Sequence, residues 1–199
     1  MNITSAMVKE LREKTGAGMM DCKEALSVSG GDFEKAIDHL RKKGMSAATK
    51  RSSKAAKDGN IASYIHMGGK IGVLVEVNCE TDFVAKTDDF QRFVKDMAMH
   101  IAAANPQYVR PDEIPAEIID REKEIYRSQA LAEKKPEKIW EKIIEGKLKK
   151  YYEDVCLVHQ KFIRDTDMTV ETMVNNMMTK TGENILIRRF VRYQLGEGS

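Results

Sequence analysis

The feature that most constrains the fold is an alternating run of residues that stops abruptly at a polar cluster. Residues 73–79 read V-L-V-E-V-N-C, in which every second residue is valine or cysteine. This period of two predicts a half-buried β-strand. The alternation ends at Glu80, and either Thr81 or Asp82 can begin a helix by accepting a backbone N–H bond. The segment therefore predicts a strand that leads directly into a helix.

Phe83 follows in the first turn of that predicted helix. An aromatic ring beside acidic residues, at an exposed corner between a strand and a helix, is suited to insertion into a partner. The alternative is that Phe83 folds back and joins the core, because large apolar residues usually lie inside. The residues alone leave both interpretations open.

Composition places the chain among soluble globular proteins. At 199 residues it can hold one or two small domains, and 42% hydrophobic with 32% charged residues is typical of that class. No apolar run is long enough to cross a bilayer, and the first residues show no signal-peptide pattern. The three cysteines, Cys22, Cys79 and Cys156, are scattered, so we expect a reducing cytoplasm rather than a disulfide framework.

Residues 1–45 are predicted to form three short helices. Thr4 can cap the first helix, which Gly16 ends, and the second begins near Met19. Asp32 caps the third helix, and Gly44 is expected to close it. Apolar residues recur at helical spacing in each segment, which predicts a minimal three-helix domain.

The rest of the chain predicts a basic linker and an α+β core. Residues 46–59 are rich in alanine, serine and basic residues and would form either a flexible linker or a frayed helix, and residues 60–199 form the core. A hairpin is predicted from residues 61–67 and 71–79, with a third strand near residues 185–195. Helices are predicted at residues 83–104, after Pro115, at 134–150 and 148–158, and from Thr169 or Glu171. A small three-stranded antiparallel sheet packed with helices is therefore the expected core.

Two long segments resemble signatures of a known family, bacterial elongation factor Ts. They are L-R-E-K-T-G-A-G-M-M-D-C-K-E-A-L at residues 11–26 and E-V-N-C-E-T-D-F-V-A-K at residues 76–86. Residues 190–198, F-V-R-Y-Q-L-G-E-G, resemble the last core strand of that family. The resemblance implies a cytoplasmic guanine nucleotide exchange factor for the GTPase elongation factor Tu. It also implies a ubiquitin-associated-like N-terminal bundle, and no enzymatic activity or cofactor of the chain itself.

The resemblance also assigns site residues. Thr81, Asp82, Phe83 and Val84 match the segment implicated in displacing Mg²⁺ from elongation factor Tu, with Phe83 as the wedge. Asp82 would add charge near the wedge, or it would serve only as the helix cap. The implied partner-binding residues are Arg12, Met19, Met20, Lys23 and His100. Each of three residues also has an alternative interpretation. Met19 would be a core residue, Lys23 would simply face solvent, and His100 would sit at a helix end with its hydrogen bonds made to the backbone.

The chain shows no strong internal repeat, so it resembles the short form of the family with one copy of the core. The resemblance then implies a homodimer. The segment around Trp140 and Cys156 would contribute to the dimer, or it would pack inside one chain.

The sequence does not indicate a P-loop, a zinc site or a catalytic cysteine. Gly69-Lys70 is not a P-loop, because Tyr64 and Ile71 replace the required glycine and hydroxyl residue. The histidines and cysteines lack the close pairs of a zinc site, so we expect no metal ligands. Acids near Cys79 would raise the pKa of its thiol and weaken it as a nucleophile, so no catalytic residue is expected.

Two rival functions remain. A nucleic-acid-binding module would use the basic residues of segment 41–57 with Arg188, Arg189 and Arg192, although the net charge is only +2. A ubiquitin- or peptide-binding adaptor would use the N-terminal bundle and leave most of the chain unexplained. Neither a membrane nor a nucleic acid is the expected partner of the preferred function.

Overall fold

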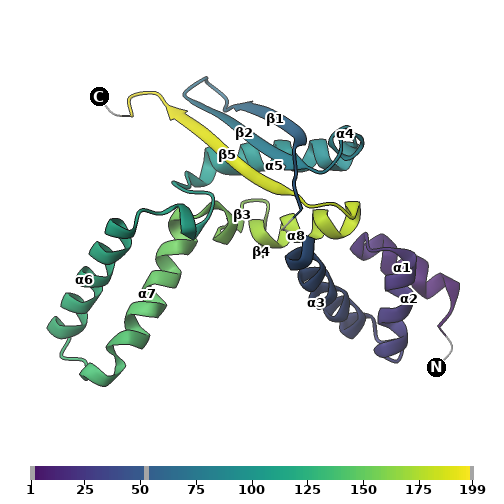
Figure 1. Cartoon of the computed structure of the whole chain (residues 1–199), viewed down its shortest axis with the longest axis horizontal. Coiled ribbons are helices and arrows are strands. Elements are labelled where there is room, and N and C mark those ends of the chain that lie inside the picture. Colours follow the sequence, from purple (N-terminus) through teal and green to yellow (C-terminus); the bar gives the residue numbers. More distant parts are fainter. Residues whose placement is uncertain (1–2, 52–53, 198–199) are drawn as a thin grey trace. The chain divides into compact units, whose positions relative to one another are not determined.

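The computed structural model describes residues 3–51 and 54–197 (Figure 1). Contacts divide the chain into two compact units. The first holds the residues up to Asn60, Val77–Arg92 and Thr172–Leu186. The second holds Ile61–Glu76, Phe93–Glu171 and the residues from Ile187 onward. The boundaries between the two units fall within three strands and two helices.

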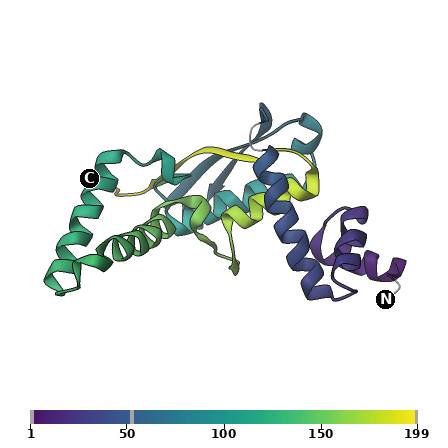
Figure 2. The same cartoon turned by 60° about the horizontal axis from the view of Figure 1, so that its bottom comes forward.

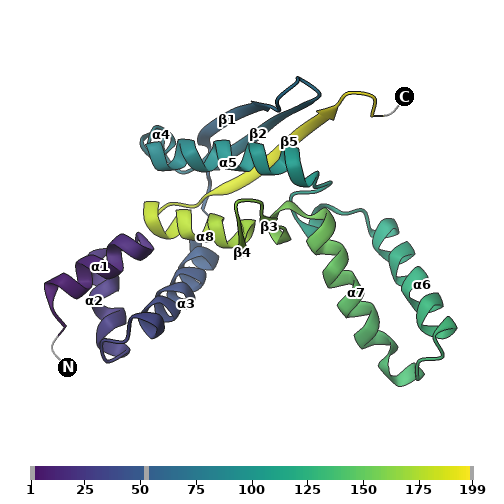
Figure 3. The ribbon, with the colours of Figure 1, turned by 180° about the vertical axis from the view of Figure 1, so that it is seen from behind.

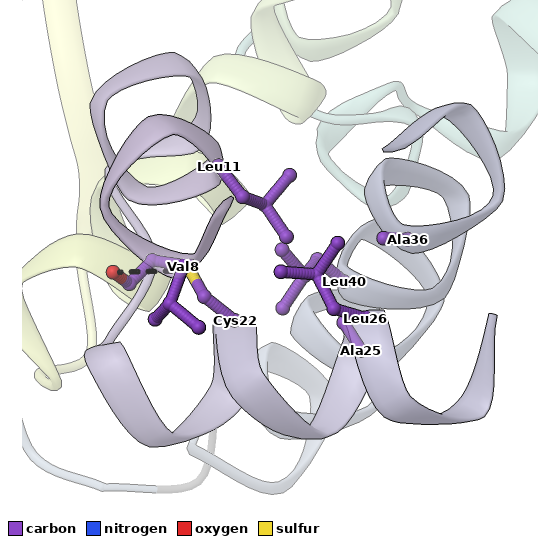
Figure 4. Close-up of a cluster of buried hydrophobic side chains, with 8 residues drawn as sticks. Val8, Leu11, Cys22, Ala25, Leu26, Ala36 and Leu40 are labelled. Atoms are coloured by element: carbon purple, nitrogen blue, oxygen red, sulfur yellow. Dashed lines mark hydrogen bonds between the residues drawn. The ribbon is translucent and has the colours of Figure 1, made fainter. Parts of the chain in front are cut away.

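Three helices open the first unit, as predicted: α1 (Ser5–Thr15), α2 (Met19–Val28) and α3 (Phe33–Arg51). The Thr4 side chain caps α1 by accepting from the Met7 N–H, and Asp32 accepts from the Lys35 N–H at the start of α3. Figure 2 shows the three helices packed together. The shared core is drawn in Figure 4 and consists of Val8, Leu11, Ala17, Cys22, Ala25, Leu26, Ala36 and Leu40.

The prediction that Gly44 closes the third helix is wrong. Helix α3 continues to Arg51, through part of the predicted basic linker. No proline interrupts residues 45–51, and their composition is compatible with a helix. Gly44 lies inside this helix, where a Cβ atom would lie 2.8 Å from the hydroxyl of Thr179.

The chain forms a three-stranded antiparallel sheet in the order β1 (Asp58–Ile65), β2 (Ile71–Cys79) and β5 (Leu186–Gln194). The alternation in β2 is confirmed, because Val73, Val75, Val77 and Cys79 are all buried. Helix α5 (Asp88–Ala104) runs along one face of the sheet (Figures 1 and 3). The α+β class, with three N-terminal helices followed by a small sheet and helices, is therefore confirmed.

In the second unit, a short 3-10 turn, η1 (Pro111–Glu113), leads to a helical hairpin. Its arms are α6 (Ala116–Ala132) and α7 (Trp140–Val155), which lie side by side in Figures 1 and 3. A 3-10 turn, η2 (Glu137–Ile139), precedes α7 and another, η3 (Leu157–His159), follows it. The predicted helices 134–150 and 148–158 are thus one shorter helix, which ends where Cys156 adopts an extended conformation.

A second, two-stranded sheet was absent from the sequence prediction. Strands β3 (Lys161–Phe162) and β4 (Asp165–Thr169) pair antiparallel, and Lys161 lies opposite Thr169. Strands of two and five residues are too short to show a clear alternating pattern. Helix α8 (Val170–Thr181) follows directly, near the predicted start at Thr169 or Glu171.

Candidate partner-binding site

The strand-to-helix corner forms as the sequence predicted, with Thr81 as the helix cap. Beyond Cys79 the chain turns into a four-residue helix, α4 (Asp82–Ala85). The Thr81 backbone is extended, with φ −131° and ψ 153°, and its hydroxyl accepts from the Val84 N–H at 3.4 Å. Thr81 therefore satisfies one of the donors that a helix start leaves without an intrahelical partner.

Phe83 is exposed. Its neighbours Val84 and Ala85 are buried and hold α4 against the rest of the unit, whereas 77% of Phe83 remains accessible to solvent. The alternative in which Phe83 joins the core is therefore wrong. The aromatic ring of Phe83 is therefore available for contact with a partner.

Asp82 is also exposed, and it does not cap the helix. Its carboxylate lies 2.6 Å from the ammonium group of Lys86, one helical turn further on. The hydrogen bond from Lys86 lowers the pKa of the Asp82 carboxyl, and the lysine charge lowers it further. Asp82 therefore carries its negative charge at neutral pH, beside the exposed ring.

The predicted helix 83–104 is broken after Ala85. The Thr87 hydroxyl donates to the Val84 carbonyl at 2.8 Å and accepts from the Phe90 N–H at 3.3 Å, so it ends one helix and caps α5. The Gln91 side chain donates to the Ala85 carbonyl at 2.6 Å across the same break. The break makes α4 a separate short element.

The Cys79 thiol lies at the base of this corner and donates to the Thr81 carbonyl at 3.1 Å. Burial raises its pKa to about 11, and the carboxylate of Glu183 contributes in the same direction. The predicted direction of the shift is therefore confirmed, although burial is its main cause. At neutral pH Cys79 is a neutral thiol and a poor nucleophile.

Two residues at the corner were missed by the sequence analysis. Glu183 and Asn184 lie between α8 and β5. The Glu183 carboxylate accepts from the backbone N–H groups of Glu80 and Thr81, and the Asn184 N–H donates to the Glu80 carboxylate. Glu183 and Thr81 are 102 positions apart, and no local pattern links them. Only the tertiary fold brings them together.

The implied docking residues of the N-terminal bundle are exposed. Arg12 lies on α1, and Met19, Met20 and Lys23 lie on α2, where 76% of Met20 is accessible. Met19 is not a core residue, contrary to the alternative interpretation, whereas Lys23 is open to solvent as that interpretation held. Flexible, polarisable methionine side chains suit an adaptable contact surface.

His100 is different, because it is fully buried in the second unit. Its Nε2 atom lies 3.1 Å from the Gln160 Oε1 atom, and its Nδ1 atom lies 3.4 Å from the Ile163 nitrogen. Burial lowers the pKa of His100 below 6.5, partly offset by the bond with Gln160. Any influence of His100 on a partner would therefore act through the interior of the chain.

Comparison with known proteins places the chain among the translation elongation factors. The family model described as elongation factor TS matches residues 1–197. The chain therefore belongs to the elongation factor Ts family.

Comparisons with individual proteins give the same family. The chain is 79% identical over 197 residues to the elongation factor Ts of Syntrophus aciditrophicus, covering 99% of this chain and 98% of that protein. It is 62% identical to the elongation factor Ts of Geobacter metallireducens and 60% identical to that of Geobacter sulfurreducens, covering all of this chain and 92% of each relative. None of the helices in the described part of the chain combines the length and apolar character needed to span a membrane.

Proposed function

We propose that the chain is a guanine nucleotide exchange factor for elongation factor Tu, acting in the cytoplasm by binding rather than by chemistry. Membership of the elongation factor Ts family supports this role. The observation that carries it is the exposed Phe83, held beside a charged Asp82 on a helix that the fold fixes at both ends.

The mechanism follows from linkage between two binding equilibria. A GTPase holds GDP through backbone donors, a lysine and a Mg²⁺ ion that bridges the phosphates. A protein that binds the nucleotide-free form more tightly than the GDP form must weaken GDP binding by the same factor. A difference of about 5.5 kcal/mol moves a population from 1:99 to 99:1. Contacts that compete with Mg²⁺ and the phosphates for their binding site are sufficient to promote GDP release.

Residues 81–84 would have two different roles in exchange. Val84 is buried and Thr81 caps α4, so these two residues hold the segment in place. Asp82 and Phe83 face solvent and would enter the partner. Phe83 would act as the wedge, and Asp82 would place a negative charge near the displaced Mg²⁺ ion. Arg12, Met19, Met20 and Lys23 would dock the ubiquitin-associated-like bundle on the same partner.

Several of the basic residues that the nucleic-acid alternative would use are paired with carboxylates or buried. Arg189 lies 2.7 Å from Glu76, and the Arg192 side chain is buried and donates to the Ala102 carbonyl. Lys43 pairs with both Asp21 and Glu24. The side chains of residues 45–53, which belong to the predicted basic segment, lie outside the described residues.

The direct test is release of fluorescent GDP from elongation factor Tu at fixed Mg²⁺ concentration. Addition of the chain should accelerate release in proportion to its concentration until binding saturates. No acceleration by a folded chain would reject the exchange function. A gel shift over a series of salt concentrations would then test the nucleic-acid alternative, whose affinity should fall steeply with salt.

We also infer a homodimer, and the sheet offers a surface for it. The outer face of the sheet, opposite the buried valines of β2, carries large exposed apolar side chains: Ile61, Ile65, Leu74, Val191 and Tyr193. These residues come from all three strands, so they form a surface and not isolated exposures. A second copy of the same face would cover them through a two-fold axis. Cys156, in contrast, is fully buried within the chain.

The dimer is tested by light scattering on wild-type chain and on Leu74→Lys, which places a charge on the central strand of that face. The wild type should have the mass of a dimer, and the variant should dissociate because each interface would bury two like charges. Leu131→Lys, at an exposed apolar position on α6, is the matched control. A wild-type monomer at all concentrations would reject the homodimer, and a dimeric Leu74→Lys would reject this face.

A further inference from the structure

Two loops that are distant in the sequence exchange hydrogen bonds at the base of α4. The Glu183 Oε2 atom accepts from the backbone N–H groups of Glu80 at 3.0 Å and Thr81 at 3.1 Å. Its Oε1 atom accepts from the Thr81 hydroxyl at 2.6 Å. In return, the Glu80 Oε1 atom accepts from the Asn184 N–H at 2.7 Å. The two loops therefore fix each other through reciprocal carboxylate-to-backbone bonds.

The bond from Thr81 to Glu183 also decides how the cap of α4 works. A threonine hydroxyl has one proton to donate and lone pairs that accept. Because the proton points to Glu183, a lone pair is available for the Val84 N–H, which the hydroxyl caps. Hydrogen bonds to a charged carboxylate are shorter and stronger than those between neutral groups. Glu183 therefore sets the direction of the hydroxyl that begins the helix.

Helix α4 needs such support because it has only four residues. The first turn of a helix fixes several backbone angles for a single hydrogen bond, so a segment this short does not persist alone. Exposed Phe83 adds little packing of its own, since most of its ring contacts solvent. The burial of Val84 and Ala85 holds one side of α4, and the direction of the ring also depends on how firmly the backbone of residues 80–82 is held.

We propose that Glu183 is a positioning residue for exchange: it orders the Thr81 cap and so presents Phe83 to the partner in its binding geometry. The role rests on the proposed exchange function. Ordering a contact residue before binding removes that cost from association, which strengthens the complex. Glu183 itself need not touch the partner.

The test measures GDP release from elongation factor Tu with Glu183→Ala, Phe83→Ala and the double variant. Glu183→Ala should lower the rate at limiting concentration by about tenfold, equivalent to about 1.4 kcal/mol. In the Phe83→Ala background the same change should have an effect below about twofold, because coupled residues are not additive. A residue that merely stabilises the fold would cause the same loss in both backgrounds.

Amide hydrogen exchange of the isolated chain gives a readout that does not involve the partner. Glu183→Ala should raise the exchange of the Glu80 and Thr81 amides, which it leaves without their acceptor. Glu183→Gln keeps the size of the side chain but offers only one accepting atom, so its effect should be intermediate. This variant also replaces Glu183→Ala if the alanine variant does not fold.

Asp89→Asn is the matched control. It removes the charge that pairs with Lys180 at 2.6 Å, which joins α8 to the start of α5 without reaching residues 80–84. The control should leave both GDP release and the two amides unchanged. If wild type accelerates release and Glu183→Ala does so equally well, the positioning role is rejected, and a full second loss in the Phe83→Ala background rejects it as well. If wild type itself has no effect, the exchange function fails instead.

Discussion

Replacement of Phe83 by alanine should reduce nucleotide exchange while leaving the stability of the fold nearly unchanged. The ring is 77% exposed, so only about a quarter of it contributes to the fold. Full burial of such a side chain is worth about 1.5–3 kcal/mol, which leaves a loss of free energy of unfolding below about 1 kcal/mol. Alanine also has the higher helix propensity, which offsets part of that loss. The variant should therefore melt close to wild type.

The cost to binding follows from the same area argument. If the partner covers the exposed three-quarters of the ring, the contact contributes about 1–2 kcal/mol, or roughly a 5- to 30-fold change in affinity. An aromatic residue at the centre of an interface can exceed this value, since single residues there cost about 2–4 kcal/mol when truncated. The expected loss in exchange is therefore at least about fivefold.

The assay is stopped-flow release of fluorescent GDP from elongation factor Tu over a series of exchange-factor concentrations. Leu131→Ala removes a comparably exposed apolar side chain from α6 and serves as the control. Wild-type rates with a folded Phe83→Ala variant would refute the wedge argument. A large fall in its melting temperature would refute the structural premise that the ring contributes little to the fold.

Three further predictions concern other parts of the chain. Gly59→Ala should lower the free energy of unfolding by about 2–4 kcal/mol, because a Cβ atom would lie 2.1 Å from the Val77 carbonyl at a φ of +142°; an unchanged denaturation midpoint would contradict this. Because burial lowers the pKa of His100 in the folded state, the folded chain binds that proton less readily than the unfolded chain. Stability should therefore be constant above the ordinary histidine pKa of 6.5 and fall as the pH drops from there through the lower folded-state value. In urea titrations across that range His100→Gln should lose this part of the pH dependence, and retention of all of it would assign the effect to other groups. Arg12→Ala should weaken binding to elongation factor Tu in calorimetry while the bundle keeps its helical circular dichroism, because Arg12 is exposed; unaltered affinity would remove Arg12 from the docking surface.

Local patterns in the sequence determined much of the fold. The period of two in residues 73–79 defines β2, and the cap residues Thr4 and Asp32 mark the starts of two helices. These features depend on hydrogen bonds and burial within a few residues, so a single stretch of sequence records them. The strand-to-helix corner that carries Phe83 was predictable for the same reason.

The tertiary structure decided what faces solvent and what holds the corner. A four-residue helix has no period from which the direction of Phe83 can be inferred, and the burial of Val84 and Ala85 settles it. Gly44 stops a helix in the local pattern, yet α3 continues past it, and a Cβ atom at Gly44 would lie 2.8 Å from the hydroxyl of the distant residue Thr179. Glu183 reaches Thr81 across 102 positions of sequence, a contact that exists only once α8 and β5 have folded against the end of β2. Long-range contacts of this kind depend on the packing of whole elements, and no short segment of the chain encodes them.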